Sequence, residues 1–342
     1  MTINSGTREL AAISDALHEL QPEGFVERIE RRLFEERIRP KMLGMESKPV
    51  MLGRWELRES IDHGAMGAVF RAFDPKLQRF VALKILLCSD DARLAERTKR
   101  METEARAMAQ LQDPNVVAVH DFQPAEPGRG DGETIPSFLV MQFVEGTTLL
   151  SWQREGDRSW PEIIDKYLQA ARGLAYIHKS GLVHRDIKPN NLLIDESGKV
   201  LIGDFGLVHG ANAEPGLEEA LEELPESAEP GPFSVRLTRQ GAVLGTLVYM
   251  APEQLRHGTT TPKSDQYSFF VALFEALHGQ RPHPGTTRET LLRAMDSGIS
   301  DDRIRGAIPR WLNTLVLRGL ERAPGNRHAS MDVVVEAIKR GL

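Results

Sequence analysis

The sequence contains a single cysteine and no long apolar run. With only Cys88 among 342 residues, the chain cannot form an internal disulfide, which fits a reducing compartment. The longest apolar stretch, residues 269–277, includes Glu275 and is far shorter than the roughly 20 residues that cross a bilayer. The first residues, MTINSGTREL, lack the apolar segment of a secretory signal. We therefore expect a cytoplasmic protein, or a cytoplasmic domain whose anchor lies outside this sequence, with no membrane contact through these residues.

An excess of positive charge is also missing. The chain has 43 basic and 49 acidic residues, a formal net charge of −6, whereas a nucleic-acid-binding domain usually carries a basic face. We therefore expect no nucleic-acid partner. The hydrophobic content of 41% and the charged content of 27% are ordinary for a globular protein. The length allows one large two-lobed domain or two smaller ones.

The first 52 residues predict a helical extension followed by a linker. Apolar residues recur at helical spacing before and after Pro22, and they are Ala11, Ile13, Leu17, Leu20, Phe25, Ile29, Leu33 and Phe34. Pro40, Gly44 and Pro49 then interrupt the pattern and predict the linker. This extension (residues 1–52) either packs on the neighbouring domain as a helical pair or serves as a regulatory or docking segment. Both interpretations are compatible with the sequence.

The remainder of the chain, residues 53–342, changes from strand-like to helical patterns. Residues 53–144 contain short β-type runs such as RFVALKIL and one expected helix, from about 90 to 111. Residues 145–342 are mostly helical in pattern. The sequence thus predicts an α+β protein with a small five-stranded antiparallel β lobe plus one main helix, and a larger, mainly α-helical lobe. Within the larger lobe, residues 210–235 hold seven glutamates and four prolines, which predicts a solvated, mobile acidic insertion.

One motif carries most of the chemical information, HRDIKPNN at residues 184–191. It resembles the catalytic loop of serine/threonine protein kinases, in particular the eukaryotic-like (Hanks-type) kinases of bacteria, and the resemblance extends over about residues 53–340. It implies a bilobal protein-kinase fold. It gives Asp186 the role of orienting the attacking hydroxyl and accepting its proton, and it places Lys188 against the γ-phosphate. It makes Asn191 a ligand of one magnesium ion.

Two further motifs supply the remaining polar groups of a kinase. Asp204 begins an Asp-Phe-Gly triplet after an apolar strand, where the family binds the Mg²⁺ that bridges the β- and γ-phosphates. Lys84 ends the run VALK, and a lysine on a buried strand needs a partner. The resemblance pairs Lys84 with the α- and β-phosphates and with a glutamate on the following helix. Glu104 is in register for that role, whereas Glu102 lies about 200° around the helix.

The phosphate-covering loop departs from the family pattern. The family has three glycines there, but this sequence has Asp62, Gly64 and Gly67 at those positions. Glycine lets backbone amides approach an anion, whereas Asp62 places negative charge near a polyphosphate. We therefore expect weakened ATP affinity without loss of activity, since the two remaining glycines lie nearer the tip of the loop.

The resemblance also assigns the adenine site. Met141 occupies the gatekeeper position, so the backbone carbonyl of Gln142 and the amide of Val144 would bind the adenine edge. The apolar residues expected around the nucleotide are Ile61, Val69, Ala82 and Leu193.

The run GTLVYMAPE resembles the segment on which kinases dock a protein substrate. Thr246 would hydrogen-bond toward the catalytic loop, which is a feature of serine/threonine kinases. Glu253 needs a buried cationic partner, and the resemblance supplies Arg327. Asp265 resembles the helix aspartate that braces the backbone of the catalytic loop.

Control by phosphorylation is expected because Arg185 precedes Asp186. The resemblance implies that Arg185 pairs with a phosphate on the activation segment. Thr238 is the favoured acceptor there and Ser234 a second candidate, although Thr238 is equally well explained as an ordinary surface threonine. The glutamates of residues 210–235 either mimic that phosphate or shield Arg185, or they form a disordered spacer.

Together these assignments predict a serine/threonine protein kinase that transfers the γ-phosphoryl group of ATP to protein hydroxyls and phosphorylates itself. Mg²⁺ is the expected metal and Mn²⁺ its substitute. Protein substrates are the expected partners, and a transient homodimer would serve autophosphorylation in trans. One alternative is a pseudokinase scaffold, suggested by Asp62 and the long activation segment but opposed by the complete set of polar groups. The other is a small-molecule kinase of the aminoglycoside or choline type, which lacks a segment like GTLVYMAPE.

Overall fold

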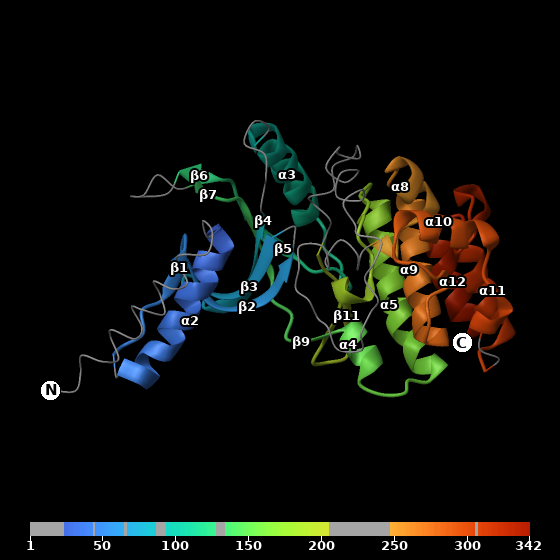
Figure 1. The fold of residues 1–342 in the computed structure, drawn as a ribbon, viewed down its shortest axis with the longest axis horizontal. Coiled ribbons are helices and arrows are strands. Elements are labelled where there is room, and N and C mark those ends of the chain that lie inside the picture. The colour runs from blue at the N-terminus through green and yellow to red at the C-terminus, as the bar shows by residue number, and fades with distance from the viewer. Residues whose placement is uncertain are drawn as a thin grey trace. The chain divides into compact units, whose positions relative to one another are not determined.

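The computed structural model describes residues 24–43, 45–64, 67–86, 94–127, 134–204, 247–304 and 307–342, which belong to two compact units (Figure 1). The first unit comprises the chain up to Glu102 together with Val119–Phe143, and the second comprises Thr103–Ala118 together with the chain from Val144 onward. Helix α3 (Leu94–Ala109) contributes residues to both units. The first unit is built on a sheet and the second on helices.

The first unit contains a six-stranded antiparallel sheet in the order β1-β2-β3-β4-β8-β5. Its strands are β1 (Val50–Leu52), β2 (Trp55–Gly64), β3 (Gly67–Asp74), β4 (Arg79–Leu86), β5 (Val119–Gln123) and β8 (Phe138–Gln142). A separate hairpin of β6 (Glu126–Pro127) and β7 (Thr134–Ile135) precedes β8 in the chain. The sheet has one strand more than expected, because β1 pairs with the first residues of β2.

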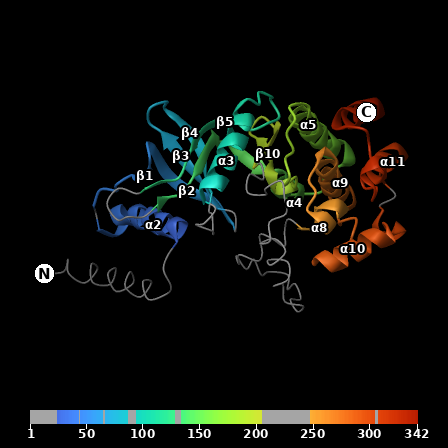
Figure 2. The same ribbon diagram turned by 90° about the horizontal axis from the view of Figure 1, so that it is seen from above.

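Helix α2 (Phe25–Leu43) packs on one face of this sheet, as Figures 1 and 2 both show. Val26 and Ile29 of α2 are buried in a cluster with alternate residues of the strands, which are Ala68, Phe70, Ala72, Val81, Leu83, Ile85, Phe138 and Val140. Since successive residues of a strand point to opposite faces, Val69 and Lys84 lie on the other face. The helix also runs through Pro40, which the sequence pattern assigns to the linker.

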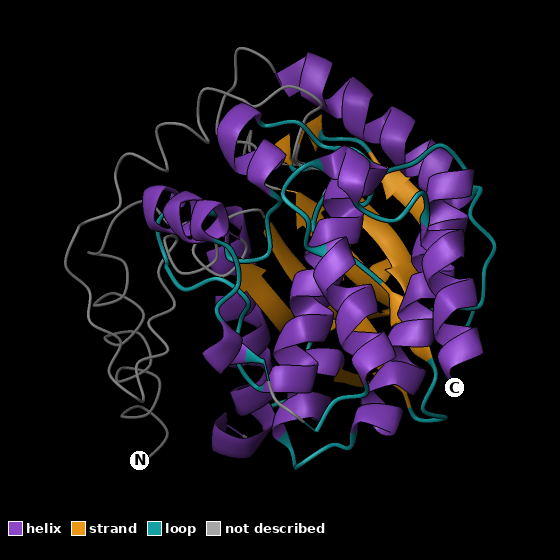
Figure 3. Cartoon of the chain, turned by 90° about the vertical axis from the view of Figure 1, so that its right-hand side faces the viewer, coloured by secondary structure: helices purple, strands orange, loops and turns teal. Residues whose placement is uncertain are grey.

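The second unit is mainly helical, as predicted for the chain beyond residue 145 (Figure 3). Its helices within the described ranges are α4 (Leu149–Arg154), α5 (Trp160–Lys179), α8 (Pro252–His257), α9 (Pro262–His278), α10 (Arg288–Ser297), α11 (Arg310–Gly319) and α12 (Met331–Gly341). Short 3₁₀ turns are present at Pro189–Asn191, Asp301–Arg303 and Pro324–Asn326. A small antiparallel sheet in the order β11-β10-β9 joins β9 (Gly146–Thr148), β10 (Leu192–Asp195) and β11 (Val200–Ile202).

Helix α9 is buried along most of its length. It begins after Thr261, whose hydroxyl accepts backbone N–H groups of the first turn, and it ends at Gly279 in the left-handed conformation. The aromatic rings of Tyr267 and Phe270 are fully buried. A polar residue in such a helix must find its partners inside the protein, and this applies to Asp265, which is only 2% exposed.

The two units have the character expected of an α+β protein, because the smaller one is built on an antiparallel sheet and the larger one is mainly helical. In the part of the chain that the structure describes, no helix is both long enough and apolar enough to span a membrane. The predicted first helix, at residues 11–20, and the acidic insertion, residues 210–235, lie outside the described residues.

Candidate active site

The catalytic-loop candidate is held by one buried carboxylate on α9. Asp265 accepts the backbone N–H groups of His184 at 2.7 Å and Arg185 at 2.8 Å. The Nε2 atom of His178, at the end of α5, donates to the same carboxylate at 2.9 Å. These contacts confirm the predicted brace. They fix the backbone immediately before Asp186 to α9, which is buried along most of its length.

His184 connects this loop to the strand that leads to Asp204. Its fully buried ring donates from Nε2 to the carbonyl oxygen of Gly203 at 2.9 Å, while Nδ1 accepts the backbone N–H of Asp186 at 3.3 Å. An acceptor Nδ1 and a donor Nε2 are the pattern of a neutral imidazole. Burial lowers the pKa of His184, which favours this neutral form.

The carboxylate of Asp186 is oriented by two side chains of the same loop. Lys188 Nζ donates to Asp186 Oδ2 at 2.8 Å, and Asn191 Nδ2 donates to the same oxygen at 3.0 Å and to the Asp186 carbonyl at 2.7 Å. Asp186 is 7% exposed. The structure thus brings together three predicted site residues, with an amine beside a largely buried carboxylate.

Asn191 and Asp204 lie at neighbouring ends of one hairpin. Leu192 of β10 pairs with Ile202 of β11, and the backbone N–H of Gly203 donates to the Asn191 carbonyl at 2.9 Å. Since Asn191 Nδ2 is turned to Asp186, its amide oxygen is the atom left to serve as a ligand.

A divalent metal fits this pair of residues. No group of three or more His, Cys, Asp or Glu side chains in the described ranges could form a metal site by itself. Mg²⁺ is usually held by one or two protein oxygens together with substrate phosphates, and the Asp204 carboxylate and the Asn191 amide oxygen are ligands of that kind. Asn191 and Asp204 therefore suit a metal that arrives with a phosphorylated substrate.

Two non-glycine residues of the site have left-handed backbone conformations. Arg185 has a φ of 72° and Asp204 has a φ of 53°. Such conformations cost about 1 kcal/mol or more each and persist where the surroundings impose them. For Arg185, the surroundings include the bond from its N–H to Asp265. Arg185 directly precedes Asp186, and Asp204 is itself one of the carboxylates to which the sequence assigns chemistry.

Glu104 is ion-paired within the second unit. Its Oε1 lies 2.8 Å from Arg185 Nη1, with both side chains partly buried. The sequence assigns Glu104 to Lys84 and Arg185 to a phosphate, so it did not foresee this pair. Residues 81 apart in the chain give no local signal of such a contact. The pairing of Glu104 with Lys84 stays a prediction.

In the first unit, four of the residues predicted to bind the nucleotide share one face of the sheet, and they are Val69, Ala82, Lys84 and Met141. Asp62 is paired with Val69, and Val69 with Lys84, which is 7% exposed. In the next row, Ala82 is paired with Met141. Directly opposed residues of antiparallel strands project from the same face. This face is opposite to the one that α2 covers.

The glycines of the phosphate-covering loop meet a steric requirement at one position. Gly64 and Gly67 pair at the ends of β2 and β3. Gly67 has a φ of 136°, and a Cβ atom there would lie 1.9 Å from the Ile85 carbonyl oxygen. Only glycine fits this approach. The two residues between these glycines lie outside the described part of the chain.

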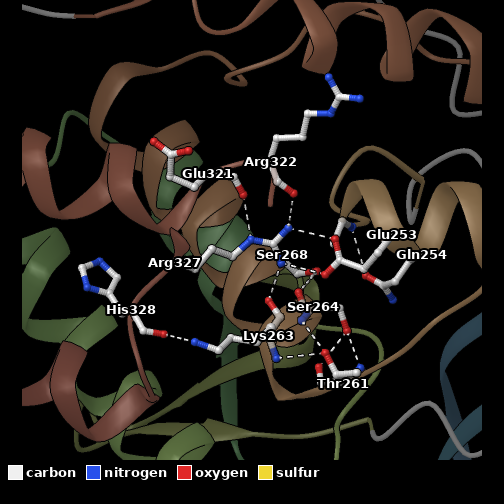
Figure 4. Close-up of polar contacts among 11 residues, drawn as sticks. Glu253, Gln254, Thr261, Lys263, Ser264, Ser268, Glu321, Arg322, Arg327 and His328 are labelled. Atoms are coloured by element: carbon white, nitrogen blue, oxygen red, sulfur yellow. Dashed lines mark hydrogen bonds and ion pairs between the residues drawn. The ribbon is translucent and has the colours of Figure 1, made fainter. Parts of the chain in front are cut away.

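The predicted ion pair of Glu253 and Arg327 is confirmed (Figure 4). Arg327 Nη1 and Nη2 donate to the two carboxylate oxygens of Glu253 at 2.7 and 2.8 Å. Arg327 also donates to three backbone carbonyls, of Glu321, Lys263 and Arg322. The pair anchors the start of α8, whose first two residues, Pro252 and Glu253, are the last two of the run GTLVYMAPE. Sequence reasoning missed another contact of this run, the hydrogen bond from the Tyr249 hydroxyl to Glu275 at 2.6 Å.

The remaining predicted residues are divided between described and undescribed parts of the chain. Ile61 lies in β2 of the first unit with its side chain exposed, Gln142 ends β8, and Val144 and Leu193 belong to the second unit. The residues outside the described ranges are Cys88, Ser234, Thr238 and Thr246.

Comparison with known proteins gives a consistent result. A family model described as protein kinase domain matches residues 55–336. The serine/threonine-protein kinase PknA of Mycobacterium tuberculosis is 37% identical over 234 residues, which are 68% of this chain and 48% of that protein.

Two further relatives align over more of this chain. PknL of Mycobacterium bovis, a serine/threonine-protein kinase, is 33% identical over 298 residues, 84% of this chain and 66% of that protein. A probable serine/threonine-protein kinase of Clostridium perfringens is 30% identical over 295 residues, 85% of this chain and 38% of that protein. The chain thus spans about half the length of PknA and a little over a third of the clostridial protein. The family match and the geometry of the catalytic loop agree, and this chain belongs to the protein kinase family.

Proposed function

We propose that this protein is a serine/threonine protein kinase that transfers the γ-phosphoryl group of ATP to serine and threonine hydroxyls of proteins. One observation carries this proposal, the cluster in which Lys188 and Asn191 both donate to the Asp186 carboxylate. A protein that only binds nucleotide has no need of a carboxylate oriented in this way. The names of the relatives support the same activity.

In this mechanism, Asp186 acts on the hydroxyl of the substrate protein. Its carboxylate accepts the hydroxyl proton as the oxygen attacks the γ-phosphorus, so that the new O–P bond forms while the bond to ADP breaks. Lys188, at 2.8 Å from this carboxylate, provides positive charge for the transferred group. Asp265 keeps the loop backbone fixed during this step.

The metal and the nucleotide are assigned to the remaining predicted residues. Asn191 and Asp204 would hold Mg²⁺, or Mn²⁺ in its place, and the bound metal supplies charge neutralisation for the phosphates. Lys84 would bind the α- and β-phosphates. The pairing of Lys84 with Glu104 is part of this proposal, and so are the adenine contacts of Gln142 and Val144.

The domain assignment and the biological setting are also proposals. We assign residues 1–52 to an N-terminal extension and residues 53–342 to the kinase domain, divided into 53–144 and 145–342, with an acidic insertion at 210–235. We infer a cytoplasmic kinase that acts on protein substrates, with a transient homodimer for autophosphorylation in trans. The control sites would be Arg185 with phosphorylated Thr238 or Ser234.

The activity is tested with ATP labelled on the γ-phosphate, a generic basic protein and Mg²⁺. The wild-type protein should label the substrate, and an Asp186→Asn variant of the same fold should not. Equal, negligible labelling by both proteins would contradict the enzyme proposal. If nucleotide binding were retained in that case, the pseudokinase alternative would replace it.

A further inference from the structure

Helix α2 is part of the core of the first unit. Val26 is fully buried and Ile29 is 8% exposed, and both belong to the same cluster as Trp55 and Leu57 of β2. Phe25 is partly buried against the same cluster. Figure 2 shows α2 lying along the sheet. The helix is therefore fixed relative to β2 by apolar packing, and a side chain on α2 can hold a side chain on β2 at a defined place.

Glu30 of α2 contacts two side chains near the end of β2. Its Oε1 accepts the hydroxyl of Ser60 at 2.8 Å, and its Oε2 lies 3.3 Å from His63 Nδ1. His63 is the residue directly before Gly64, the last residue of β2. Glu30 and His63 are each 31% exposed, so the contact is partly shielded from water. One carboxylate thus joins α2 to both sides of Ile61.

These two contacts depend on an irregularity in the pairing of β2 with β3. Ser60 is paired with Phe70, whereas His63 is paired with Ala68, so Ile61 is an extra residue on β2. In a regular strand, positions 60 and 63 would point to opposite faces. The extra residue brings both side chains to the face of Phe70 and Ala68, which is the face that α2 covers.

The same irregularity determines which residue faces the nucleotide. Asp62 pairs with Val69 and therefore lies on the face of Lys84, opposite to α2. A slip of the end of β2 by one residue would exchange the faces of Asp62 and His63. The contacts of Glu30 oppose such a slip, because they hold His63 on the α2 face.

We propose that Glu30 is a positioning residue for the phosphate-covering loop, and that α2 strengthens ATP binding by fixing the end of β2 from behind. The inference rests on the proposed kinase function, in which Gly64 and Gly67 approach the phosphates. A glycine-containing loop loses conformational freedom when it orders over an anion. Because Glu30 already holds the end of β2 in place, less conformational freedom is lost when the loop orders, and the affinity for ATP is higher as a result.

The test compares Glu30→Gln with a matched control, Glu35→Gln. Glu35 lies on the same helix, about 140° around its axis from Glu30, and makes no hydrogen bond or ion pair with β2 among the described residues. We expect Glu30→Gln to raise the KM for ATP about three- to tenfold, the range for loss of a charge-assisted hydrogen bond, with kcat within about twofold. Glu35→Gln should leave both constants unchanged.

A double-mutant cycle shows whether the effect passes through β2. We expect Glu30→Gln to raise KM much less when Ser60→Ala and His63→Ala are already present, because the partners of the carboxylate are then gone. Additive effects in this cycle would overturn the proposal. An unchanged KM with only a lower unfolding temperature would overturn it as well, since α2 would then serve stability alone.

Amide hydrogen exchange separates a failure of this inference from a failure of the proposed function. In the wild-type chain and the two variants, peptides that cover β2 and β3 are compared without nucleotide. We expect faster exchange at the end of β2 in Glu30→Gln only. This result supports the positioning role even if the wild-type protein transfers no phosphate, whereas identical exchange in all three proteins overturns it.

Discussion

The buried ion pair of Glu253 and Arg327 allows a quantitative prediction for the change Arg327→Met. The Arg327 side chain is fully buried and that of Glu253 is 15% exposed. The substitution leaves the Glu253 carboxylate and the carbonyls of Glu321, Lys263 and Arg322 without the guanidinium that they share. Removal of one partner of a buried pair costs about 3–5 kcal/mol. We take the lower end, about 3 kcal/mol, because Glu253 retains some contact with water.

This loss corresponds to a measurable change in melting temperature. A domain of this size class loses about 2–4 °C per kcal/mol, so that the transition of the second unit should move down by about 6–12 °C. Scanning calorimetry or circular dichroism in the absence of nucleotide measures it. The matched control is Arg322→Met in the same loop, because the Arg322 side chain is 57% exposed and its pair with Asp296 is on the surface. We expect a change of at most about 0.5 kcal/mol there.

A cost for Arg327→Met no greater than that for Arg322→Met, or below about 1 kcal/mol, would show that this ion pair does not stabilise the second unit. In either case the Glu253 carboxylate would have found water or another cation, and the ion pair would not anchor α8. A parallel variant, Arg327→Lys, keeps the charge but not the two-pronged geometry, and it should fall between the wild type and Arg327→Met.

Two other predictions concern charge at the phosphate-covering loop and pH. Asp62→Gly should lower the KM for ATP about two- to fivefold at low salt and less at 0.5 M salt, because Asp62 shares a face with Lys84 and its field is screened; a KM that rises or stays constant would contradict this. Burial, with nearby Arg303, lowers the pKa of His283 to about 4 in the folded protein. As pH falls below about 6.5, His283 is therefore protonated in the unfolded chain while it is still neutral in the folded one, which favours unfolding. Stability should therefore fall by about 2 kcal/mol from pH 7 to pH 5 through this residue, and His283→Gln should show a correspondingly smaller slope in unfolding experiments.

The predicted site residues that the structure brings together belong to one contiguous motif. Asp186, Lys188 and Asn191 lie within one short loop, so their contact follows once the loop is identified. The partners Asp265 and Arg327 lie far away in the chain, but each sits in a helix or turn whose position relative to the loop is set by the fold.

The contacts that the sequence did not predict depend on strand register and on which side chains, distant in the chain, the fold brings together. The register of β2 contains an extra residue at Ile61, and no pattern in the sequence indicates it, so the contacts of Glu30 could not be foreseen. More than one cationic side chain is a candidate partner of Glu104, and only the structure shows that it pairs with Arg185. The strand β1 is three residues long, too short for an alternating pattern to be recognised.

Asp186 is the residue that we propose to promote phosphoryl transfer to serine and threonine hydroxyls. Phosphoamino-acid analysis of a protein substrate, combined with initial rates for wild type and Asp186→Asn, measures both the type of acceptor and the contribution of this carboxylate. We predict phosphoserine and phosphothreonine as products and a rate about 10²–10⁴-fold lower in the variant, the range for loss of a general base. Phosphotyrosine as the main product, or a variant as fast as the wild type, would contradict the assignment of this carboxylate.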